Sequence, residues 1–210
     1  MKKLVPFNNA HFSKEIPKKI NKLFKSKFVQ TAAGFNYSKK CNKFIEKKLN
    51  VKKCYVTNSC TAALEVAAII INLKKGDEVI LPSYTFVSTA NAILLRGATP
   101  VYVDIKDDDL NINEELISQS ITKRTKAIMV VHYAGFPCNM LKIKKIAKKN
   151  NLFLIEDAAQ SFLSKYKNRY LGTIGDIGCI SFHETKNITS AEGGAILINN
   201  KNLIKKCSIV

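Results

Sequence analysis

The sequence contains no tryptophan and only three arginines among its 210 residues. The remaining 31 of its 34 basic residues are lysines, and because only 16 residues are acidic the formal net charge is +18 at pH 7. Proteins that read nucleic-acid bases rely on arginine, whose planar guanidinium group makes paired hydrogen bonds. A net charge this high points to a nucleic-acid-binding module. Because the charge comes almost entirely from lysine rather than arginine, that function is disfavoured, and we predict no nucleic-acid partner.

Long hydrophobic runs are also missing. The longest apolar stretch, residues 62–73, is interrupted by Glu65 and Asn72 and is shorter than the roughly 20 residues that a membrane-spanning helix needs. The first nine residues include lysines but no apolar segment typical of a secretory signal. We therefore expect no membrane partner and a cytoplasmic location.

Several motifs of catalysis and metal binding are absent. The six cysteines form no C-x-x-C pair, which disfavours zinc ribbons, redox motifs and a disulfide framework. No G-x-G-x-x-G, G-x-x-x-x-G-K-[ST] or G-x-S-x-G segment is present. His183-Glu184 begins like a zinc-protease helix, but Asn187 occupies the position of the second histidine, so we expect no metal site.

The pattern of apolar residues indicates the fold class. Residues 13–28 and 38–49 repeat apolar side chains at helical spacing, and from residue 53 onward β-rich runs alternate with helical stretches. This alternation predicts an α/β fold with a mostly parallel central sheet and helices on both faces. We expect N-terminal helices within residues 1–50 and an α/β core over residues 51–210. The expected core strands are 54–57, 78–82, 99–104, 127–132 and 152–157, and the helices between them are 61–71, 86–96, 113–121 and 139–149.

Polar residues follow the expected strands at the sheet edge where such folds bind ligands. Ser59, Cys60 and Thr61 open a helix, whose free amide groups can hold a phosphate, although a simple helix cap explains the same turn equally well. Asp157 closes an apolar strand, where its carboxylate could face a protonated ring nitrogen or cap a second helix. His132 and Tyr133 lie at another strand end, and we assign them no role.

Lys186 stands apart from the other lysines of the chain. It is the only lysine between Lys167 and Lys201, and it follows the polar and aromatic residues 181–185. A lysine shielded from water loses its proton more readily and can then form a Schiff base. This isolation singles out Lys186 as a candidate nucleophile.

Five segments carry distinctive motifs: 58–65 (NSCTAALE), 76–91 (GDEVILPSYTFVSTAN), 156–160 (EDAAQ), 172–178 (GTIGDIG) and 181–187 (SFHETKN). Together they resemble the DegT/DnrJ/EryC1/StrS sugar-nucleotide aminotransferases, which are pyridoxal-phosphate enzymes of fold type I. The resemblance covers essentially the whole chain. Segments 76–91 and 181–187 are most similar to the branch of the family that makes dTDP-4-amino-4,6-dideoxygalactose for enterobacterial common antigen.

The resemblance implies roles for residues at the matching positions. Lys186 would form a Schiff base with pyridoxal 5'-phosphate and later move the proton of the reaction. Asp157 would pair with the pyridinium nitrogen and keep it protonated. Gln160 would contact the 3-hydroxyl group of the cofactor, and Phe86 would stack on its ring. The cofactor phosphate would be held by Cys60, Thr61 and Ser181.

The implied reaction moves an amino group from glutamate to a 4-keto-6-deoxy sugar carried on dTDP, in the biosynthesis of a cell-surface polysaccharide. The expected partners are the nucleotide sugar, glutamate and a second copy of the chain in a homodimer. Some relatives are dehydratases with histidine at the position of the lysine, so Lys186 favours transamination.

The sequence also departs from the family pattern. Because the family's chains are roughly twice as long, we expect residues 1–210 to form an incomplete large domain without the small C-terminal domain. Ser190 and Ala191 stand in a loop where close relatives have glycine, so we expect positive φ angles to be lost there and the orientation of Lys186 to be affected. The alternatives to an aminotransferase are a truncated, inactive remnant or scaffold of the family, and a basic nucleic-acid-binding module.

Overall fold

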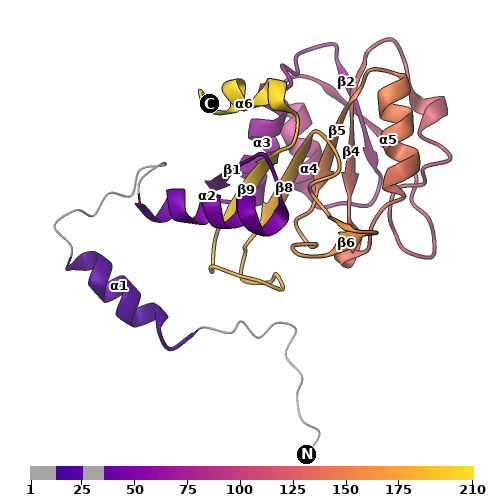
Figure 1. Cartoon of the computed structure of the whole chain (residues 1–210). Coiled ribbons are helices and arrows are strands. Elements are labelled where there is room, and N and C mark those ends of the chain that lie inside the picture. The colour runs from indigo at the N-terminus through magenta and orange to yellow at the C-terminus, as the bar shows by residue number, and fades with distance from the viewer. Residues whose placement is uncertain (1–12, 26–35) are drawn as a thin grey trace, which may run out of the picture.

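The computed structural model describes residues 13–25 and 36–210, and Figure 1 shows their arrangement. The helices are α1 (Ile16–Phe24), α2 (Asn36–Leu49), α3 (Cys60–Ile70), α4 (Val87–Leu94), α5 (Met140–Lys149) and α6 (Lys201–Cys207). The strands are β1 (Lys53–Thr57), β2 (Glu78–Pro82), β3 (Thr99–Val103), β4 (Thr125–Val131), β5 (Phe153–Asp157), β6 (Lys165–Tyr166), β7 (Arg169–Tyr170), β8 (Ile177–Ser181) and β9 (Gly194–Ile198).

Seven strands form one sheet in the order β1-β9-β8-β5-β4-β2-β3. The four pairings from β3 to β8 are parallel, while β9 lies antiparallel between β8 and β1. The mostly parallel α/β sheet predicted from the sequence is therefore confirmed. Strands β6 and β7 form a separate small hairpin.

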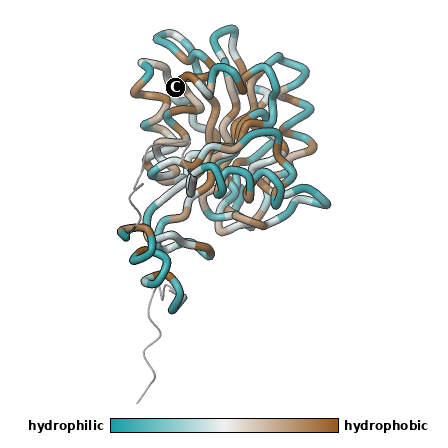
Figure 2. Tube along the Cα trace, turned by 60° about the vertical axis from the view of Figure 1, so that its left-hand side comes forward, coloured by the Kyte–Doolittle hydropathy of each residue, from teal (hydrophilic) through white to brown (hydrophobic). Residues whose placement is uncertain are grey.

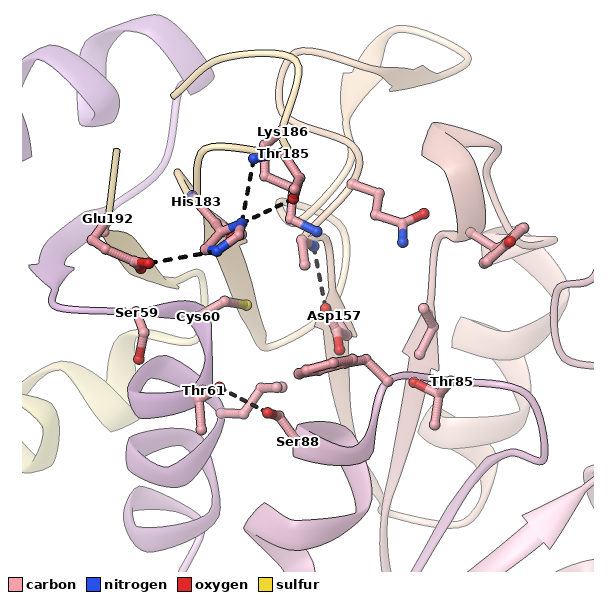
Figure 3. Close-up of a pocket in the computed structure, with 18 of the residues that line it drawn as sticks. Ser59, Cys60, Thr61, Thr85, Ser88, Asp157, His183, Thr185, Lys186 and Glu192 are labelled. Atoms are coloured by element: carbon pink, nitrogen blue, oxygen red, sulfur yellow. Dashed lines mark hydrogen bonds and ion pairs between the residues drawn. The ribbon is translucent and has the colours of Figure 1, made fainter. Parts of the chain in front are cut away.

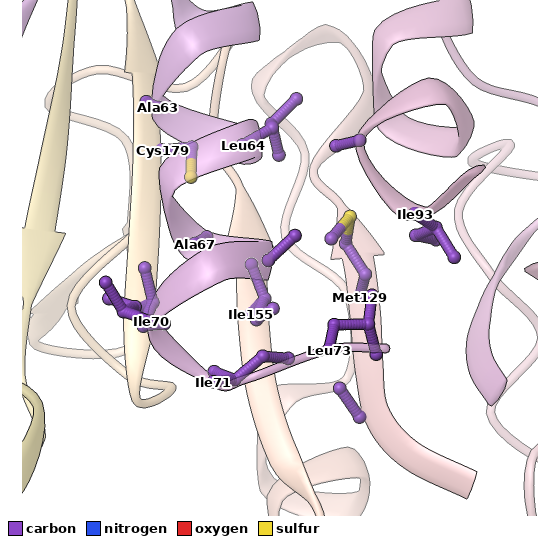
Figure 4. Packing of buried hydrophobic residues seen from close by; sticks show 14 of the residues in the cluster. Ala63, Leu64, Ala67, Ile70, Ile71, Leu73, Ile93, Met129, Ile155 and Cys179 are labelled. Carbon is purple, nitrogen blue, oxygen red and sulfur yellow. The ribbon is translucent and has the colours of Figure 1, made fainter. Parts of the chain in front are cut away.

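Both faces of the sheet are covered by helices. On one face, Val79, Leu81 and Met129 belong to a core shared with α3, α4 and α6. Ile80, between Val79 and Leu81, and Ile128, the neighbour of Met129, belong to a second core on the α5 side, as the two-residue period of a strand requires. Figure 4 shows α3 packed on the sheet, and in Figure 2 hydrophobic residues concentrate inside the body of the molecule. Burial on both faces explains why the central strands are almost continuously apolar.

Two of the expected helices differ from the structure. Residues 113–121 form turns and a short 3-10 helix, Ser118–Ser120, so the prediction of an α-helix there was wrong. The Ser120 hydroxyl donates to the Leu116 carbonyl, which competes with helical backbone bonding. Of the helix expected over 13–28, α1 covers Ile16–Phe24 with no buried residue, and 26–28 lie outside the described residues.

Within residues 13–25 and 36–210, none of the helices combines the length and the apolar character that crossing a membrane requires.

Glu156 is the buried carboxylate that organises the centre of the sheet. It lies near the end of β5, fully buried, and its oxygens accept hydrogen bonds from the amides of Gly172, Ile174 and Gly175. The Nε2 of His132 lies 3.0 Å from Oε2 of Glu156. Because Nδ1 of the same ring accepts from the Cys138 amide, the ring proton lies on Nε2 and is donated to Glu156. These bonds tie β4, β5 and the turn before β8 together.

The pKa of Glu156 reflects this set of donors. Burial raises the pKa, but the hydrogen bond from His132 and those from the backbone amides outweigh burial and hold it below its ordinary value of 4.5. A carboxyl group whose pKa is lowered by folding stabilises the fold above its unfolded pKa, and that contribution is lost as the pH falls through the folded pKa.

We predict that Glu156→Gln lowers the free energy of unfolding by roughly 2–4 kcal/mol at pH 7, because the amide NH2 group meets backbone donors. Urea unfolding followed by circular dichroism would measure this, with the largely exposed Glu115→Gln as control, expected within about 0.5 kcal/mol of the parent. The difference between the parent and Glu156→Gln should shrink as the pH falls below 4.5. Equal stabilities of these two proteins at pH 7 would contradict the prediction.

Candidate functional site

A cavity of about 650 Å³ opens at the carboxyl ends of the parallel strands, beside the first turns of α3 and α4. Figure 3 shows side chains from these elements facing it. The volume lies within the range of small-molecule sites. The cavity brings together all seven residues predicted from the sequence: Cys60, Thr61, Phe86, Asp157, Gln160, Ser181 and Lys186.

One wall of the cavity is the N-terminus of α3. Ser59 is the N-cap residue, and its hydroxyl accepts a hydrogen bond from the Ala62 amide. The cap interpretation is therefore confirmed for Ser59, but the amides of Cys60 and Thr61 have no acceptor within the helix and are available to an anion. The Thr61 hydroxyl bonds to Ser88 of α4 at 2.7 Å, which joins the two helix starts.

Gly194 allows this wall to lie close to the sheet. A Cβ atom at Gly194 would lie 2.4 Å from the Ser59 carbonyl carbon and 2.6 Å from the Cys60 nitrogen. A larger residue at the start of β9 would therefore displace the helix N-terminus. The close approach leaves a compact set of amides whose partial positive charge suits a phosphate group.

Asp157 lies at the inner end of the cavity with only 4% of its surface exposed. Its carboxylate accepts hydrogen bonds from the Thr89 hydroxyl at 2.9 Å and the Ala159 amide at 3.2 Å. Burial raises the pKa of Asp157, and the hydrogen bonds from Thr89 and Ala159 together with the charge of Lys186 only partly oppose this. A buried carboxylate that receives bonds only from uncharged groups among the described residues would gain a favourable ion pair from a cationic ligand atom. A protonated pyridine nitrogen fits this requirement.

Gln160 and Phe86 offer complementary contacts to a flat ligand. The Oε1 of Gln160 accepts a hydrogen bond from the Ala134 amide at 2.6 Å, so its NH2 group remains as the donor toward the cavity. Phe86 precedes α4 and keeps 73% of its surface exposed, which is unusual for a large aromatic side chain that lines a cavity. An aromatic ring stacked on Phe86 would cover that surface.

Lys186 reaches the cavity from the loop between β8 and β9. Its amide donates to the His183 carbonyl, and its half-buried side chain lines the cavity. In Figure 3, His183 bridges the loop by contacting Thr185 on one side and Glu192 on the other. Lys186, from this loop, and Asp157, at the end of β5, therefore line the same cavity.

The Lys186 loop keeps a left-handed residue without glycine. Ala191 has φ of 70°, so the expectation that a positive φ angle is lost there was wrong. The Ala191 amide bonds to the Thr189 hydroxyl, which itself donates to the Phe182 carbonyl, and the Ser190 hydroxyl donates to the Glu192 carbonyl. These side-chain hydrogen bonds offset the steric cost of about 1–2 kcal/mol that a left-handed alanine carries.

Sequence reasoning missed several residues of the site. Ser88 and Thr89 contact two of the predicted residues, and the only sequence signal was their place in the first turn of the helix after Phe86. Tyr84 was also missed, and its hydroxyl lies 3.3 Å from that of Tyr133, which the sequence placed at a strand end; both residues line the cavity. His132, noted at the same strand end, is fully buried against Glu156.

Comparisons with known proteins identify the family. The family model of the DegT/DnrJ/EryC1/StrS aminotransferases matches residues 11–210, and the chain belongs to this family. It is 48% identical over 153 residues to an uncharacterised protein of Methanocaldococcus jannaschii, covering 73% of this chain and 40% of that protein. It is 44% identical over 173 residues to GDP-perosamine synthase of Escherichia coli O157:H7, covering 82% of this chain and 47% of that protein.

Solved structures of sugar aminotransferases share this fold. The putative sugar aminotransferase Spr1654 of Streptococcus pneumoniae, solved in its PLP form, matches with a TM-score of 0.90 and 28% identity, over 98% of this chain and 55% of that one. The same protein has also been solved in its PMP form. These matches confirm the fold-type I interpretation and the pyridoxal-phosphate cofactor expected for the family. The chain spans about half the length of the relatives that it matches.

Cys60 gives a test of the cavity in the cofactor-free chain. Burial raises the pKa of its thiol well above the ordinary value, with further contributions from the Asp157 carboxylate and Cys179. Because the thiolate is the reactive form, we predict that iodoacetamide at pH 7.5 modifies the exposed Cys41 at least about tenfold faster than Cys60. Mass spectrometry of timed samples would measure both rates. Equal rates would show that Cys60 is not enclosed as described.

Proposed function

We propose that this chain provides the cofactor-binding half of a pyridoxal-phosphate-dependent aminotransferase that acts on a nucleotide-linked keto sugar. The observation that carries the proposal is that Lys186 and the buried, charge-unpaired Asp157 line one cavity together with the amides at the start of α3. An amine, a carboxylate and an anion site in one cavity match the aldehyde, the ring nitrogen and the phosphate of the cofactor.

Each residue has a distinct task in this proposal. The Nζ atom of Lys186 attaches the cofactor and carries a proton to and from the substrate carbon. Asp157 holds the proton on the ring nitrogen, while the NH2 group of Gln160 donates to the ring oxygen. Phe86 covers one ring face, and the phosphate is held by the Cys60 and Thr61 amides with the hydroxyls of Thr61 and Ser181. When bound, the cofactor supplies an electron-accepting ring that stabilises a carbanion.

The substrates follow from the family rather than from the cavity. We assign glutamate as amino donor and a 4-keto-6-deoxy sugar on a nucleotide as acceptor, in the biosynthesis of a cell-surface polysaccharide. The motif resemblance favours dTDP as the nucleotide, whereas the similarity to GDP-perosamine synthase favours GDP. Purified protein offered both nucleotide sugars would decide between them.

We also assign a homodimer. Leu94, the last residue of α4, and its C-cap residue Leu95 follow Val87 by seven and eight positions, about two helical turns, so the three lie on one side of the helix, and each is more than half exposed. This apolar face continues into Phe86 at the cavity, so a second copy would cover both.

The proposal predicts that borohydride reduction in the presence of pyridoxal 5'-phosphate labels Lys186 alone among the 31 lysines. Mass spectrometry of proteolytic peptides would locate the label. Lys186→Ala should abolish labelling, whereas Lys167→Ala, a change at an exposed lysine, should leave it intact. Absent labelling, or labelling spread over surface lysines, would instead support an inactive remnant or scaffold.

The dimer has its own test. Sedimentation velocity should give a dimer for the parent chain, and Val87→Glu combined with Leu95→Glu should give a monomer, because charges would be buried in the interface. The matched pair Lys145→Glu and Lys149→Glu on exposed positions of α5 should remain dimeric. A monomeric parent would refute the assignment.

A further inference from the structure

Thr89 makes a hydrogen bond that links α4 to the end of β5. Its side chain is fully buried, and its hydroxyl lies 2.9 Å from Oδ2 of Asp157. On its other side, the Thr89 hydroxyl lies 2.7 Å from the Thr85 hydroxyl. Thr85 lines the cavity, so a chain of two hydroxyl groups runs from the cavity wall to the buried carboxylate.

The direction of these hydrogen bonds follows from the donors available. An ionised carboxylate only accepts hydrogen bonds, so the Thr89 hydroxyl proton points to Asp157. The single hydroxyl proton of Thr89 is then used, and Thr85 must donate to the Thr89 oxygen. The Ala159 amide occupies the other oxygen, Oδ1, so each oxygen of Asp157 keeps one lone pair for a ligand.

Within the part of the chain that the structure describes, no charged side chain donates a hydrogen bond to Asp157, and Lys186 acts on it only through its charge. The ionisable groups that influence the carboxylate are Lys186, His132, Cys60 and Cys179. His132 already bonds to Glu156 and to the Cys138 amide, so both of its ring nitrogens are occupied. The cysteines are buried thiols whose pKa values are raised by burial, so they stay protonated and carry no charge.

We propose that Thr89, oriented by Thr85, is a positioning residue that holds the Asp157 carboxylate ionised and aimed at the ring nitrogen of the cofactor. The cofactor part rests on the proposed function, whereas the action of Thr89 on Asp157 stands on the hydrogen bonds alone. Removing the hydroxyl withdraws a donor to the charged form, so the pKa of Asp157 rises further and the carboxylate turns more freely. The ring nitrogen then keeps its proton less well.

The test compares Thr89→Val, which keeps the shape and loses the hydroxyl, with Thr89→Ser, which keeps the hydroxyl and loses a methyl group. In the cofactor-free chain, the ¹³C signal of the Asp157 carboxyl group is followed against pH. Thr89→Val should raise the titration midpoint by about one pH unit, and Thr89→Ser should leave it near the parent value. Thr85→Val should give a smaller shift in the same direction, and it serves as the informative variant if Thr89→Val does not fold.

The cofactor-loaded chain gives a second readout. Thr89→Val should weaken binding of pyridoxal 5'-phosphate about tenfold, and the ¹⁵N shift of the labelled ring nitrogen should move toward its unprotonated value. Thr125→Val removes a buried hydroxyl at the first residue of β4, at the end of the strand away from the cavity, and should change neither readout.

An unchanged Asp157 midpoint in Thr89→Val, or equal shifts in Thr89→Val and Thr89→Ser, would overturn the proposal in favour of a packing role. Failure of the parent chain to bind the cofactor at Lys186 would refute the proposed function and the aiming of Asp157 at the cofactor. The carboxyl titration would still decide whether Thr89 controls Asp157.

Discussion

The site depends on two adjacent buried carboxylates at the end of β5. Because side chains alternate along a strand, Glu156 and Asp157 point to opposite faces of the sheet. Glu156 is satisfied by three backbone amides and His132, and its pKa is lowered. Within residues 13–25 and 36–210, Asp157 receives only two bonds, both from uncharged groups, and its pKa is raised. Glu156 thus anchors β5 on one face with all its hydrogen-bond partners in place, while on the other face Asp157 would still be stabilised by a positively charged partner.

Much of the fold and site follows from local pattern. Apolar strands alternating with helices predicted the parallel sheet, and the rule that ligands bind at carboxyl ends of strands directed attention to Asp157 and the Ser59–Thr61 turn. Lys186 was singled out by isolation and then by motif. These features depend on neighbours in the sequence or on a general property of parallel sheets, so one sequence suffices to find them.

Other features depend on contacts between distant segments. The bond from Thr89 to Asp157 joins residues 68 positions apart, and a threonine in a helix has no pattern that reveals such a partner. His132 does not line the cavity, because its two ring nitrogens form hydrogen bonds with Glu156 and with the Cys138 amide. Residues 113–121 have the apolar spacing of a helix, but the Ser120 hydroxyl bonds to the backbone there and the segment forms turns and a short 3-10 helix instead. Ala191 keeps a left-handed angle because neighbouring hydroxyls support it.

The pairing of β1 with β9 sets the order in which the site can be assembled. Thr57 pairs with Gly194, and β9 is the neighbour of β1 in the described sheet. During synthesis from the N-terminus, the helix start that would hold a phosphate emerges early, but the glycine that packs against it emerges only after β8 and the Lys186 loop. Contacts of such long sequence separation form slowly. A ribosome-bound chain that ends before Gly194 therefore already carries Lys186 and Asp157 but lacks the strand that packs against the start of α3.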